Sequence, residues 1–302
     1  MKHILKAEQF TDTKELEKLF KLADRMQAAD DKGKIPQTLA GKIVATLFFE
    51  PSTRTRLSFE AAALKLGAGV ISAENAMEST KAARGEPLED IIRVVNQYAD
   101  AVVFRHSKEG SAEAAAKVSD IPLINAGDGA NEHPTQALND LYTIKRETGR
   151  LDNLHVALAC DPKHSRTIRS LALLLSLYRG NKLTFISPES LRAAPDFLEK
   201  LKQRGIQLTE TADLKSGLDA DVLYMNRLQE ERFAEKNEFE KYRRALILTA
   251  DMLKDKDVVV LDPLPRIDEI AMEVDSLPNA KYFAQVKNGL YLRMALLQEI
   301  LS

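Results

Sequence analysis

The chain has 302 residues, which is long for a single hydrophobic core, so two domains are expected. Hydrophobic residues make up 44% of the sequence and the net charge is −2, which gives no basic field that would attract nucleic acid. No apolar run is long enough to cross a bilayer, and the N-terminal residues lack the apolar core of a signal peptide. We therefore expect a cytoplasmic protein without nucleic-acid or membrane partners, and the single Cys160, expected to be a buried inert thiol, fits a reducing compartment.

Short apolar runs alternate with longer helical patterns along the chain. The expected strands are residues 43–49, 69–72, 101–104, 122–125, 155–160, 182–186, 221–225 and 258–261. Helices are expected over residues 57–66, 88–98, 135–148, 167–178 and 195–204. This alternation predicts an α/β fold in which parallel sheets are flanked by helices.

A turn-rich loop at residues 126–131 interrupts this alternation, and residues 149–153 restart the strand pattern. We therefore predict two α/β domains, each a parallel sheet flanked by helices, with an active-site cleft between them. Ligands of such open sheets bind at the carboxyl ends of the strands. The residues that follow the strands are thus the first candidates for a site.

The densest group of hydrogen-bond donors follows the first expected strand, in the stretch Phe48-Phe49-Glu50-Pro51-Ser52-Thr53-Arg54-Thr55-Arg56. It delivers two hydroxyl–guanidinium pairs to the first turn of a helix, where backbone N–H groups and the helix dipole favour anions. The expected ligands of a phosphate dianion are Ser52, Thr53, Arg54 and Thr55. The alternative is an ordinary helix cap, with Ser52 capping and both arginines in solvent.

Polar residues follow most of the other expected strands as well. In chain order they include Arg105, His106, His133, Gln136, Asp161, Arg166, Asn226, Arg227, Gln229, Asp262 and Arg266. Any one of them is more often a plain surface residue, but their recurrence predicts an anion-binding cleft. Neither a nucleophile with a paired base nor a metal-ligand spacing is present, so we expect no cofactor or metal and a site that works by positioning and charge stabilisation. One substrate should carry phosphate and another should carry more than one carboxylate.

Several motifs are spread over nearly the whole chain. They are FFEPSTRTRLSFE (48–60), RGE (84–86), FRH (104–106), NAGDGANEHPTQ (125–136), GRLDNLHVA (149–157), RTIRSL (166–171), DVLYMNRLQEERF (221–233), DPLPRIDEIA (262–271) and NG-x3-R (288–293). Together they resemble the motifs of the catalytic subunits of aspartate carbamoyltransferases. The pair STRTR and HPTQ is typical of carbamoyltransferases in general. RLQ together with PLPRIDEI points to the aspartate branch of that superfamily.

The resemblance implies transfer of the carbamoyl group of carbamoyl phosphate to the α-amine of L-aspartate. The products would be N-carbamoyl-L-aspartate and phosphate, in pyrimidine biosynthesis. Residues 1–133 with 287–302 would form the carbamoyl phosphate-binding domain, and residues 134–286 the aspartate-binding domain. The implied partners are these two substrates and two further copies of the chain, in a homotrimer with shared active sites. Regulatory chains are a further partner that the resemblance allows.

The resemblance also implies roles for individual residues. The phosphate would be held by Ser52, Thr53, Arg54 and Thr55. The carbamoyl oxygen would be faced by Thr55, Arg105 and His133. The expected catalytic residues are therefore Arg54, Thr55, Arg105 and His133. The carbamoyl amino group would be contacted by Gln136 and by the carbonyl groups of Pro263 and Leu264. The two aspartate carboxylates would be bound by Arg166 and Arg227, and Gln229 would place the amine. Thr80 and Arg84 would reach the site of a neighbouring subunit.

The chain departs from the family pattern at a few positions. Thr80 and Arg84 stand where the family usually has Ser and Lys, and Cys160 stands where it usually has Gly. Asp262 replaces a usual His and puts a negative charge beside an anion cleft, unless it faces away or pairs with an arginine. Two alternatives therefore stay open: a catalytically weak homologue, or a carbamoyltransferase for another amine such as ornithine, which Arg227 would repel.

Overall fold

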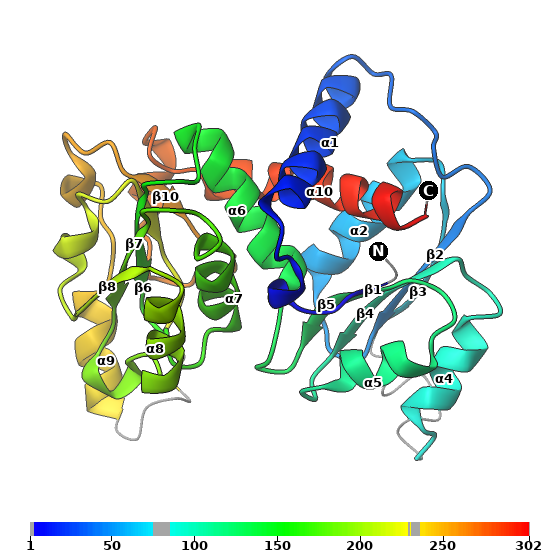
Figure 1. Cartoon of the computed structure of the whole chain (residues 1–302). Coiled ribbons are helices and arrows are strands. Elements are labelled where there is room, and N and C mark those ends of the chain that lie inside the picture. Colours follow the sequence, from blue (N-terminus) through cyan, green and yellow to red (C-terminus); the bar gives the residue numbers. More distant parts are fainter. Residues whose placement is uncertain (1–2, 75–84, 229, 231–235, 302) are drawn as a thin grey trace. The chain divides into compact units, whose positions relative to one another are not determined.

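The chain forms two compact units in the computed structural model, which describes residues 3–74, 85–228, 230 and 236–301 (Figure 1). The first unit comprises Met1–Asn139 with Lys287–Ser302, and the second comprises Asp140–Val286. The division falls within two helices, α6 (Pro134–Thr148) and α10 (Tyr282–Leu301). Each unit contains its own five-stranded sheet.

The sheet of the first unit has the strand order β1-β5-β4-β2-β3, and all of its pairings are parallel. Its strands are β1 (His3–Ile4), β2 (Ile43–Phe48), β3 (Gly69–Glu74), β4 (Ala101–His106) and β5 (Leu123–Asp128). Phe48 of β2 is in register with Arg105 of β4. The chain therefore leaves these two neighbouring strands at the same edge of the sheet.

Helices cover both faces of this sheet. They are α1 (Thr13–Asp31), α2 (Thr53–Lys65), α4 (Leu88–Val95) and α5 (Ser111–Val118), together with parts of α6 and α10. Buried residues of α4 and α5, such as Ile92 and Ala115, pack with Leu47 and Phe104 of the strands in one apolar cluster. Figure 1 shows α1 and α2 on the opposite side of the sheet from α4 and α5.

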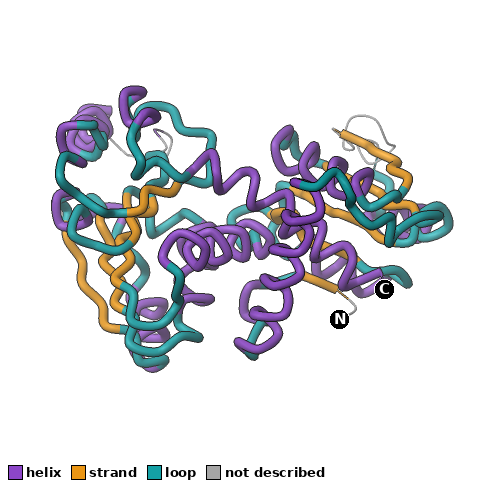
Figure 2. The backbone as a smooth tube through the Cα atoms, turned by 90° about the horizontal axis from the view of Figure 1, so that it is seen from above, coloured by secondary structure: helices purple, strands orange, loops and turns teal. Residues whose placement is uncertain are grey.

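The second unit has the strand order β10-β9-β6-β7-β8, again with parallel pairings throughout. Its strands are β6 (His155–Ala159), β7 (Lys182–Ile186), β8 (Gln207–Thr211), β9 (Val222–Tyr224) and β10 (Val259–Leu261), and its helices are α7 (Arg166–Leu175), α8 (Pro195–Gln203) and α9 (Lys236–Ala245). Along β6 every residue from Val156 to Ala159 is fully buried, so both faces of the strand are covered. Seen from above, helices flank the strands of each unit (Figure 2).

Shorter 3-10 helices connect these elements. They are Ala7–Gln9, Glu189–Leu191, Leu214–Gly217, Asp251–Leu253 and Met272–Ser276. Within the described residues, no helix combines the length and the apolar character needed to cross a bilayer.

The predicted fold class, two α/β domains with parallel sheets flanked by helices, is confirmed. Every expected strand is present, although β4, β5 and β3 extend two or three residues beyond the expected ends. The apolar pattern does not indicate β1 and β8. Helix α2 begins at Thr53, four residues before the apolar pattern that predicts it.

Candidate functional site

The first predicted anion site lies at the N-terminus of α2, directly after β2. Ser52 is the N-cap residue, with φ −158° and ψ 77°, but its side chain makes no capping hydrogen bond to any described residue. Thr55 in the first turn is only 8% exposed, whereas Arg54 is exposed. The first N–H groups of a helix have no intrahelical partners, so this turn offers donors to an anion. Ser52 does not act as the ordinary capping residue of the alternative interpretation.

Arg105 lies on the neighbouring strand β4 and is buried, with 9% of its surface exposed. Its Nη1 donates to the carbonyl oxygen of Ala126 at 3.1 Å, and its Nη2 forms an ion pair with Glu50 at 3.0 Å. Burial lowers the pKa of Arg105, the charge of Glu50 opposes this shift, and the positive charge of Arg54 adds to it. Arg105 on β4 and the start of α2 after β2 thus lie at the same edge of the sheet, where Phe48 of β2 is in register with Arg105.

The second arginine of the motif does not join them. Arg56 Nη1 lies 3.2 Å from Glu60 Oε1 and 3.1 Å from Ser72 Oγ, and its Nη2 lies 2.9 Å from Glu74 Oε2. These contacts tie α2 to strand β3. Arg56 is not among the predicted phosphate ligands, and two carboxylates bind its guanidinium.

The loop after β5 is organised around Asp128, which is 1% exposed. Its carboxylate accepts hydrogen bonds from the backbone N–H groups of Gly110 (3.0 Å) and Glu132 (3.2 Å). It also accepts from the side-chain amides of Asn125 (3.1 Å) and Asn131 (3.2 Å). One carboxylate thus fixes the turn that leads to His133.

His133 and Gln136 lie at the start of α6 and are 6% and 9% exposed. The Thr135 hydroxyl lies 3.5 Å from His133 Nδ1, and the backbone N–H of Gln136 donates to the His133 carbonyl at 3.1 Å. The described residues of the first unit that are predicted to bind substrate thus lie at the end of, or after, three adjacent strands, β2, β4 and β5. We call them the first-unit cluster: Ser52, Thr53, Arg54, Thr55, Arg105, His133 and Gln136.

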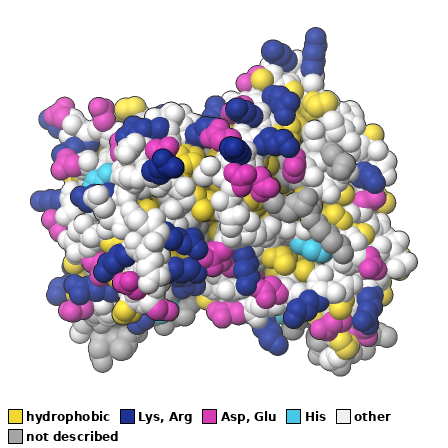
Figure 3. All heavy atoms as spheres, in the orientation of Figure 1, with side chains coloured by type: hydrophobic (Ala, Val, Ile, Leu, Met, Phe, Trp, Pro, Cys, Tyr) yellow, Lys and Arg dark blue, Asp and Glu magenta, His cyan; other side chains and the backbone are white. Residues whose placement is uncertain are grey.

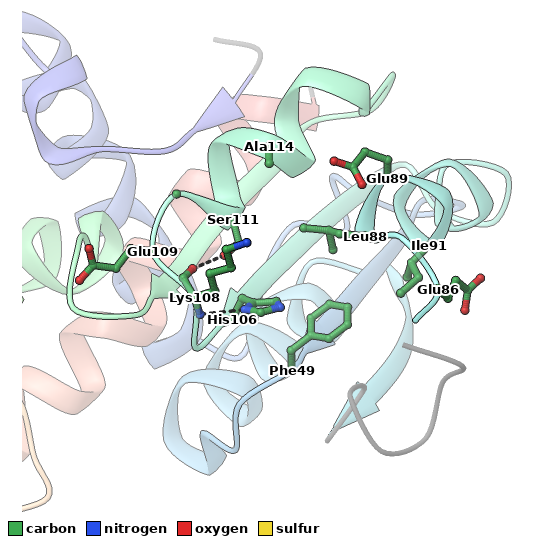
Figure 4. Close-up of a pocket in the computed structure, with 11 residues that line it drawn as sticks. Phe49, Glu86, Leu88, Glu89, Ile91, His106, Lys108, Glu109, Ser111 and Ala114 are labelled. Carbon is green, nitrogen blue, oxygen red and sulfur yellow. Dashed lines mark hydrogen bonds between the residues drawn. The ribbon is translucent and has the colours of Figure 1, made fainter. Parts of the chain in front are cut away.

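His106 does not belong to this cluster, although it follows Arg105. Neighbouring residues of a strand point to opposite faces, and His106 lines a cavity of about 490 Å³ together with Phe49, Lys108 and Ser111 (Figure 4). Its Nδ1 accepts from the Lys108 N–H at 2.9 Å, and its ring lies 4.9 Å from that of Phe49. Burial lowers the pKa of His106, so the neutral ring is favoured. No predicted substrate residue lines this cavity.

In the second unit, Arg166 begins α7 and Arg227 follows β9. Ser165 caps α7, since its Oγ accepts from the Ile168 N–H at 3.3 Å. The Asn226 amide donates to Ser165 Oγ at 2.9 Å and to the Thr167 hydroxyl at 3.0 Å. These bonds join the residues that flank Arg166 to the residue before Arg227, so both arginines occupy the same edge of the sheet.

The turn between β6 and α7 contains Cys160 and Asp161, both buried. Asp161 Oδ1 accepts from the backbone N–H of His164 at 3.0 Å and lies 3.2 Å from His164 Nδ1. Cys160 has a φ of 91°, in the region that favours glycine. The prediction of a buried thiol is confirmed, and burial raises the pKa of this thiol.

The loop after β10 carries the predicted carbonyl ligands Pro263 and Leu264. Asp262, just before them, is 2% exposed, and its Oδ1 accepts from the Leu264 N–H at 2.6 Å. It therefore neither faces outward nor pairs with an arginine among the described residues. We call Arg166, Arg227, Pro263 and Leu264 the second-unit cluster.

Three predicted site residues, Thr80, Arg84 and Gln229, lie outside the described residues. Among the residues that the structure does describe, no group of three His, Cys, Asp or Glu side chains could hold a metal ion. Charged side chains of both signs are interspersed over the face drawn in Figure 3.

Sequence reasoning assigns no roles to Glu50, Asp128 and Asp161. Glu50 stands inside the donor-rich motif after β2, where a lone carboxylate among cationic donors is itself a signal. Asp128 and Asp161 each follow a buried strand at a turn, and Asp side chains commonly organise such turns by accepting backbone N–H groups. Asp128 and Asp161 are buried and Glu50 is half-buried, and their contacts identify all three as residues that hold the loops after the strands.

Comparisons with known proteins give one consistent result. Residues 2–146 match the family model described as the carbamoyl-P binding domain of aspartate/ornithine carbamoyltransferase, and residues 152–300 match its Asp/Orn binding domain. The chain is 49% identical over 293 residues to the aspartate carbamoyltransferase catalytic subunit of Methanopyrus kandleri, covering 96% of this chain and 94% of that one. The catalytic subunit of that name from Methanocaldococcus jannaschii is 44% identical, with 100% and 98% covered.

Solved structures agree. The catalytic subunit of M. jannaschii aspartate transcarbamoylase is similar, with a TM-score of 0.95 and 43% identity over 99% of this chain and 98% of that one. The enzyme of that name from Trypanosoma cruzi, in complex with N-(phosphonacetyl)-L-aspartic acid, has a TM-score of 0.93 and 37% identity over 100% and 96%.

Proposed function

Because the chain belongs to the aspartate/ornithine carbamoyltransferase family, we propose that it transfers the carbamoyl group of carbamoyl phosphate to the α-amine of L-aspartate. The products are N-carbamoyl-L-aspartate and phosphate, and the reaction belongs to pyrimidine biosynthesis. The observation that carries the proposal within the molecule is that the donor-rich first turn of α2 follows β2 directly, where Phe48 is in register with Arg105 on the neighbouring strand β4. Two guanidinium groups beside helix N–H donors suit a phosphate dianion.

The first-unit cluster binds carbamoyl phosphate in this proposal. Ser52, Thr53, Arg54 and Thr55 hold the phosphate group. Thr55, Arg105 and His133 direct donors at the carbamoyl oxygen, on which negative charge grows as the amine attacks. Gln136 accepts from the carbamoyl amino group, and the phosphate leaves with the pair of electrons of the broken C–O bond and collects the proton of the amine.

The second-unit cluster binds aspartate. Arg166 and Arg227 each take one carboxylate through a forked pair of N–H donors, and the carbonyl groups of Pro263 and Leu264 accept from the carbamoyl amino group. Gln229 helps to place the amine. Residues 1–133 with 287–302 act as the carbamoyl phosphate domain, and residues 134–286 act as the aspartate domain.

An assay of carbamoyl transfer with alternative acceptors tests the proposal. Purified chain is incubated with carbamoyl phosphate and either L-aspartate or L-ornithine, and both phosphate and the carbamoylated product are measured. We expect product with aspartate and none with ornithine, since two arginines select a dicarboxylate and repel a cationic side chain. Product with ornithine alone would contradict the proposal. Absence of product with both acceptors would indicate the catalytically weak homologue.

We further propose a cytoplasmic homotrimer in which Thr80 and Arg84 act in a neighbouring subunit's site. The relatives from M. kandleri and M. jannaschii are named as catalytic subunits. Mixed trimers of Arg84→Ala and His133→Ala subunits test this assembly. A site that takes its Arg84 from one variant and its His133 from the other is intact, so mixed trimers should recover part of the activity. If reassembled trimers of verified mass recover no activity, the active sites are not shared between subunits. The same mass measurement also shows whether a regulatory chain co-purifies.

A further inference from the structure

Two buried carboxyl groups meet in the loop that carries Pro263 and Leu264. Asp262 begins this loop and is 2% exposed, and Glu269 near its end is 4% exposed. Acidic side chains are rarely buried to this degree unless they have a partner. The proposed reaction does not account for the burial of these two acidic side chains, so the groups that surround them must do so.

Each carboxyl group has one oxygen that accepts from the loop backbone. Asp262 Oδ1 accepts from the Leu264 N–H at 2.6 Å, and Glu269 Oε2 accepts from the Ile267 and Asp268 N–H groups at 2.9 and 3.1 Å. The other two oxygens, Asp262 Oδ2 and Glu269 Oε1, are fully buried, and no described residue donates a hydrogen bond to either. Glu269 acts electrostatically on Asp262, as expected for two buried carboxyl groups of one short loop.

The polar groups that face this pair from other elements add no positive charge. Asp140 on α6 accepts from the Tyr224 hydroxyl at 2.8 Å and from the Gln285 amide at 2.6 Å. The other end of the Gln285 amide accepts from the Asp262 N–H at 3.1 Å. These bonds extend the acidic cluster across α6, β9 and α10.

The remaining titratable neighbours are the buried Cys160 thiol and Asp161, which faces His164. Arg266, on the loop itself, is bound to the carboxylate of Asp275. Among the described residues, no Lys, Arg or His lies within ion-pair range of Asp262 or Glu269. The described residues thus supply no cation to balance two ionised carboxylates.

We propose that Asp262 and Glu269 share one proton between Oδ2 and Oε1, and that the pair positions the Pro263–Leu264 carbonyl groups toward the substrate. One added proton turns two buried acceptors into a donor and an acceptor. The positioning role rests on the proposed function, whereas the shared proton does not. Burial and the charge of Glu269 raise the pKa of Asp262 well above its usual range, in agreement with a retained proton.

The backbone at Leu264 explains how the pair positions the two carbonyl groups. Leu264 has a φ of 57°, which residues other than glycine adopt at a cost in free energy. The bond from its N–H to Asp262 Oδ1 holds that conformation, and the proton holds Asp262 against Glu269. A second ionisation would place two like charges together in a dry site and release the turn.

Thermal unfolding against pH tests the shared proton without any assay of activity. The folded chain keeps a proton that the unfolded chain loses above a pH of about 4, so this contribution to stability is full below that pH and is lost as pH rises toward the raised pKa. Asp262→Asn replaces the proton with a fixed N–H donor and leaves the same net charge. From pH 5 to 9, the Tm of the wild-type protein should fall relative to that of Asp262→Asn by about 3 °C per pH unit.

Glu269→Gln is the mirror variant and should give the same pH-dependent difference. A Tm difference that stays constant with pH, in both variants, would overturn the shared proton. Failure of both isosteric variants to fold would overturn it too, because each retains a donor at the required place.

Kinetics with saturating carbamoyl phosphate and aspartate test the positioning role. Asp262→Ala removes the acceptor for the Leu264 N–H and should lower kcat by about 10- to 100-fold, while Asp262→Asn should stay within about 3-fold of the wild-type value. Equal kcat values in all three proteins would overturn positioning and leave the shared proton standing. If Asp262→Ala does not fold, Asp262→Asn alone tests the role, and a folded Asp262→Asn protein without measurable turnover would overturn positioning.

Discussion

Two arginines in one short motif, Arg54 and Arg56, have different environments. Arg56 is bound by Glu60 and Glu74 and links α2 to the edge strand β3. Arg54 is exposed at the first turn of the helix and interacts electrostatically with Arg105. Helical geometry separates residues that are two apart onto different faces, so the sequence order alone could not tell which arginine is available to a ligand.

Cys160 carries a backbone strain that glycine would relieve. Its φ of 91° disfavours any residue with a Cβ atom, although its buried thiol packs in the core of the second unit. We predict that Cys160→Gly is more stable than Cys160→Ala by about 1 kcal/mol in urea unfolding, the reverse of the usual order. The control is Ala159→Gly on the adjacent strand, which should lose about 1–2 kcal/mol. A Cys160→Gly protein less stable than Cys160→Ala would contradict the strain.

At the scale of the elements, Asp30 joins three helices of the first unit. On α1, its carboxylate accepts from Lys65 of α2 at 2.6 Å and from Lys287 and Tyr291 of α10 at 3.1 and 3.0 Å. The bond from Lys65, supported by the other two, lowers the pKa of Asp30 to about 2. The ionised carboxylate thus stabilises the packing of these helices.

The sign of this contribution predicts a dependence on pH. Because the pKa of Asp30 is lower in the folded chain than in the unfolded chain, its ionised carboxylate stabilises the fold at pH values above about 4, the pKa in the unfolded chain. This stabilisation is lost as the pH falls toward 2. Both lysines are partly exposed, so solvent screening limits the effect. We expect Asp30→Asn to lower the free energy of unfolding by about 1 kcal/mol at pH 7, and the difference to shrink between pH 5 and pH 3. A difference that is independent of pH would show that the charge of Asp30 contributes nothing.

The apolar pattern predicts elements well where strands are buried on both faces, as in β6 and β7. It gives no sign of β1, because two residues carry no periodicity, or of β8, an edge strand whose side chains are largely exposed. It also places the start of α2 too late, since the first turn of that helix is polar and the apolar pattern begins only at Leu57. The residues after the strands lie in turns, as predicted, but alternation along β4 sends Arg105 and His106 to opposite faces.

The same limit applies to Asp262. Its residue type and position suggest a charge beside an anion site, whereas its burial near Glu269 and its bond from the Leu264 N–H lead to the proposal of a retained proton. Sequence spacing cannot supply this, because the two acids come together through the folding of the loop between them.

At the scale of the whole molecule, each unit repeats one architecture and assembles one cluster at the carboxyl edge of its sheet. The first-unit cluster has the donors for a phosphate, and the second-unit cluster has two arginines for a dicarboxylate. Neither cluster alone could join the two substrates. The proposed function therefore predicts that one ligand with a phosphonate and two carboxylates binds to both clusters.

Calorimetric titration with N-(phosphonacetyl)-L-aspartic acid tests this claim most directly, with Arg54→Ala, Arg227→Ala and, as the matched control, Arg56→Ala. Loss of a forked, charge-assisted contact should raise the Kd about 100-fold or more in each of the first two variants. Arg56→Ala should lower the Tm but keep the Kd within about 3-fold of the wild-type value. Wild-type affinity in both Arg54→Ala and Arg227→Ala would contradict the account.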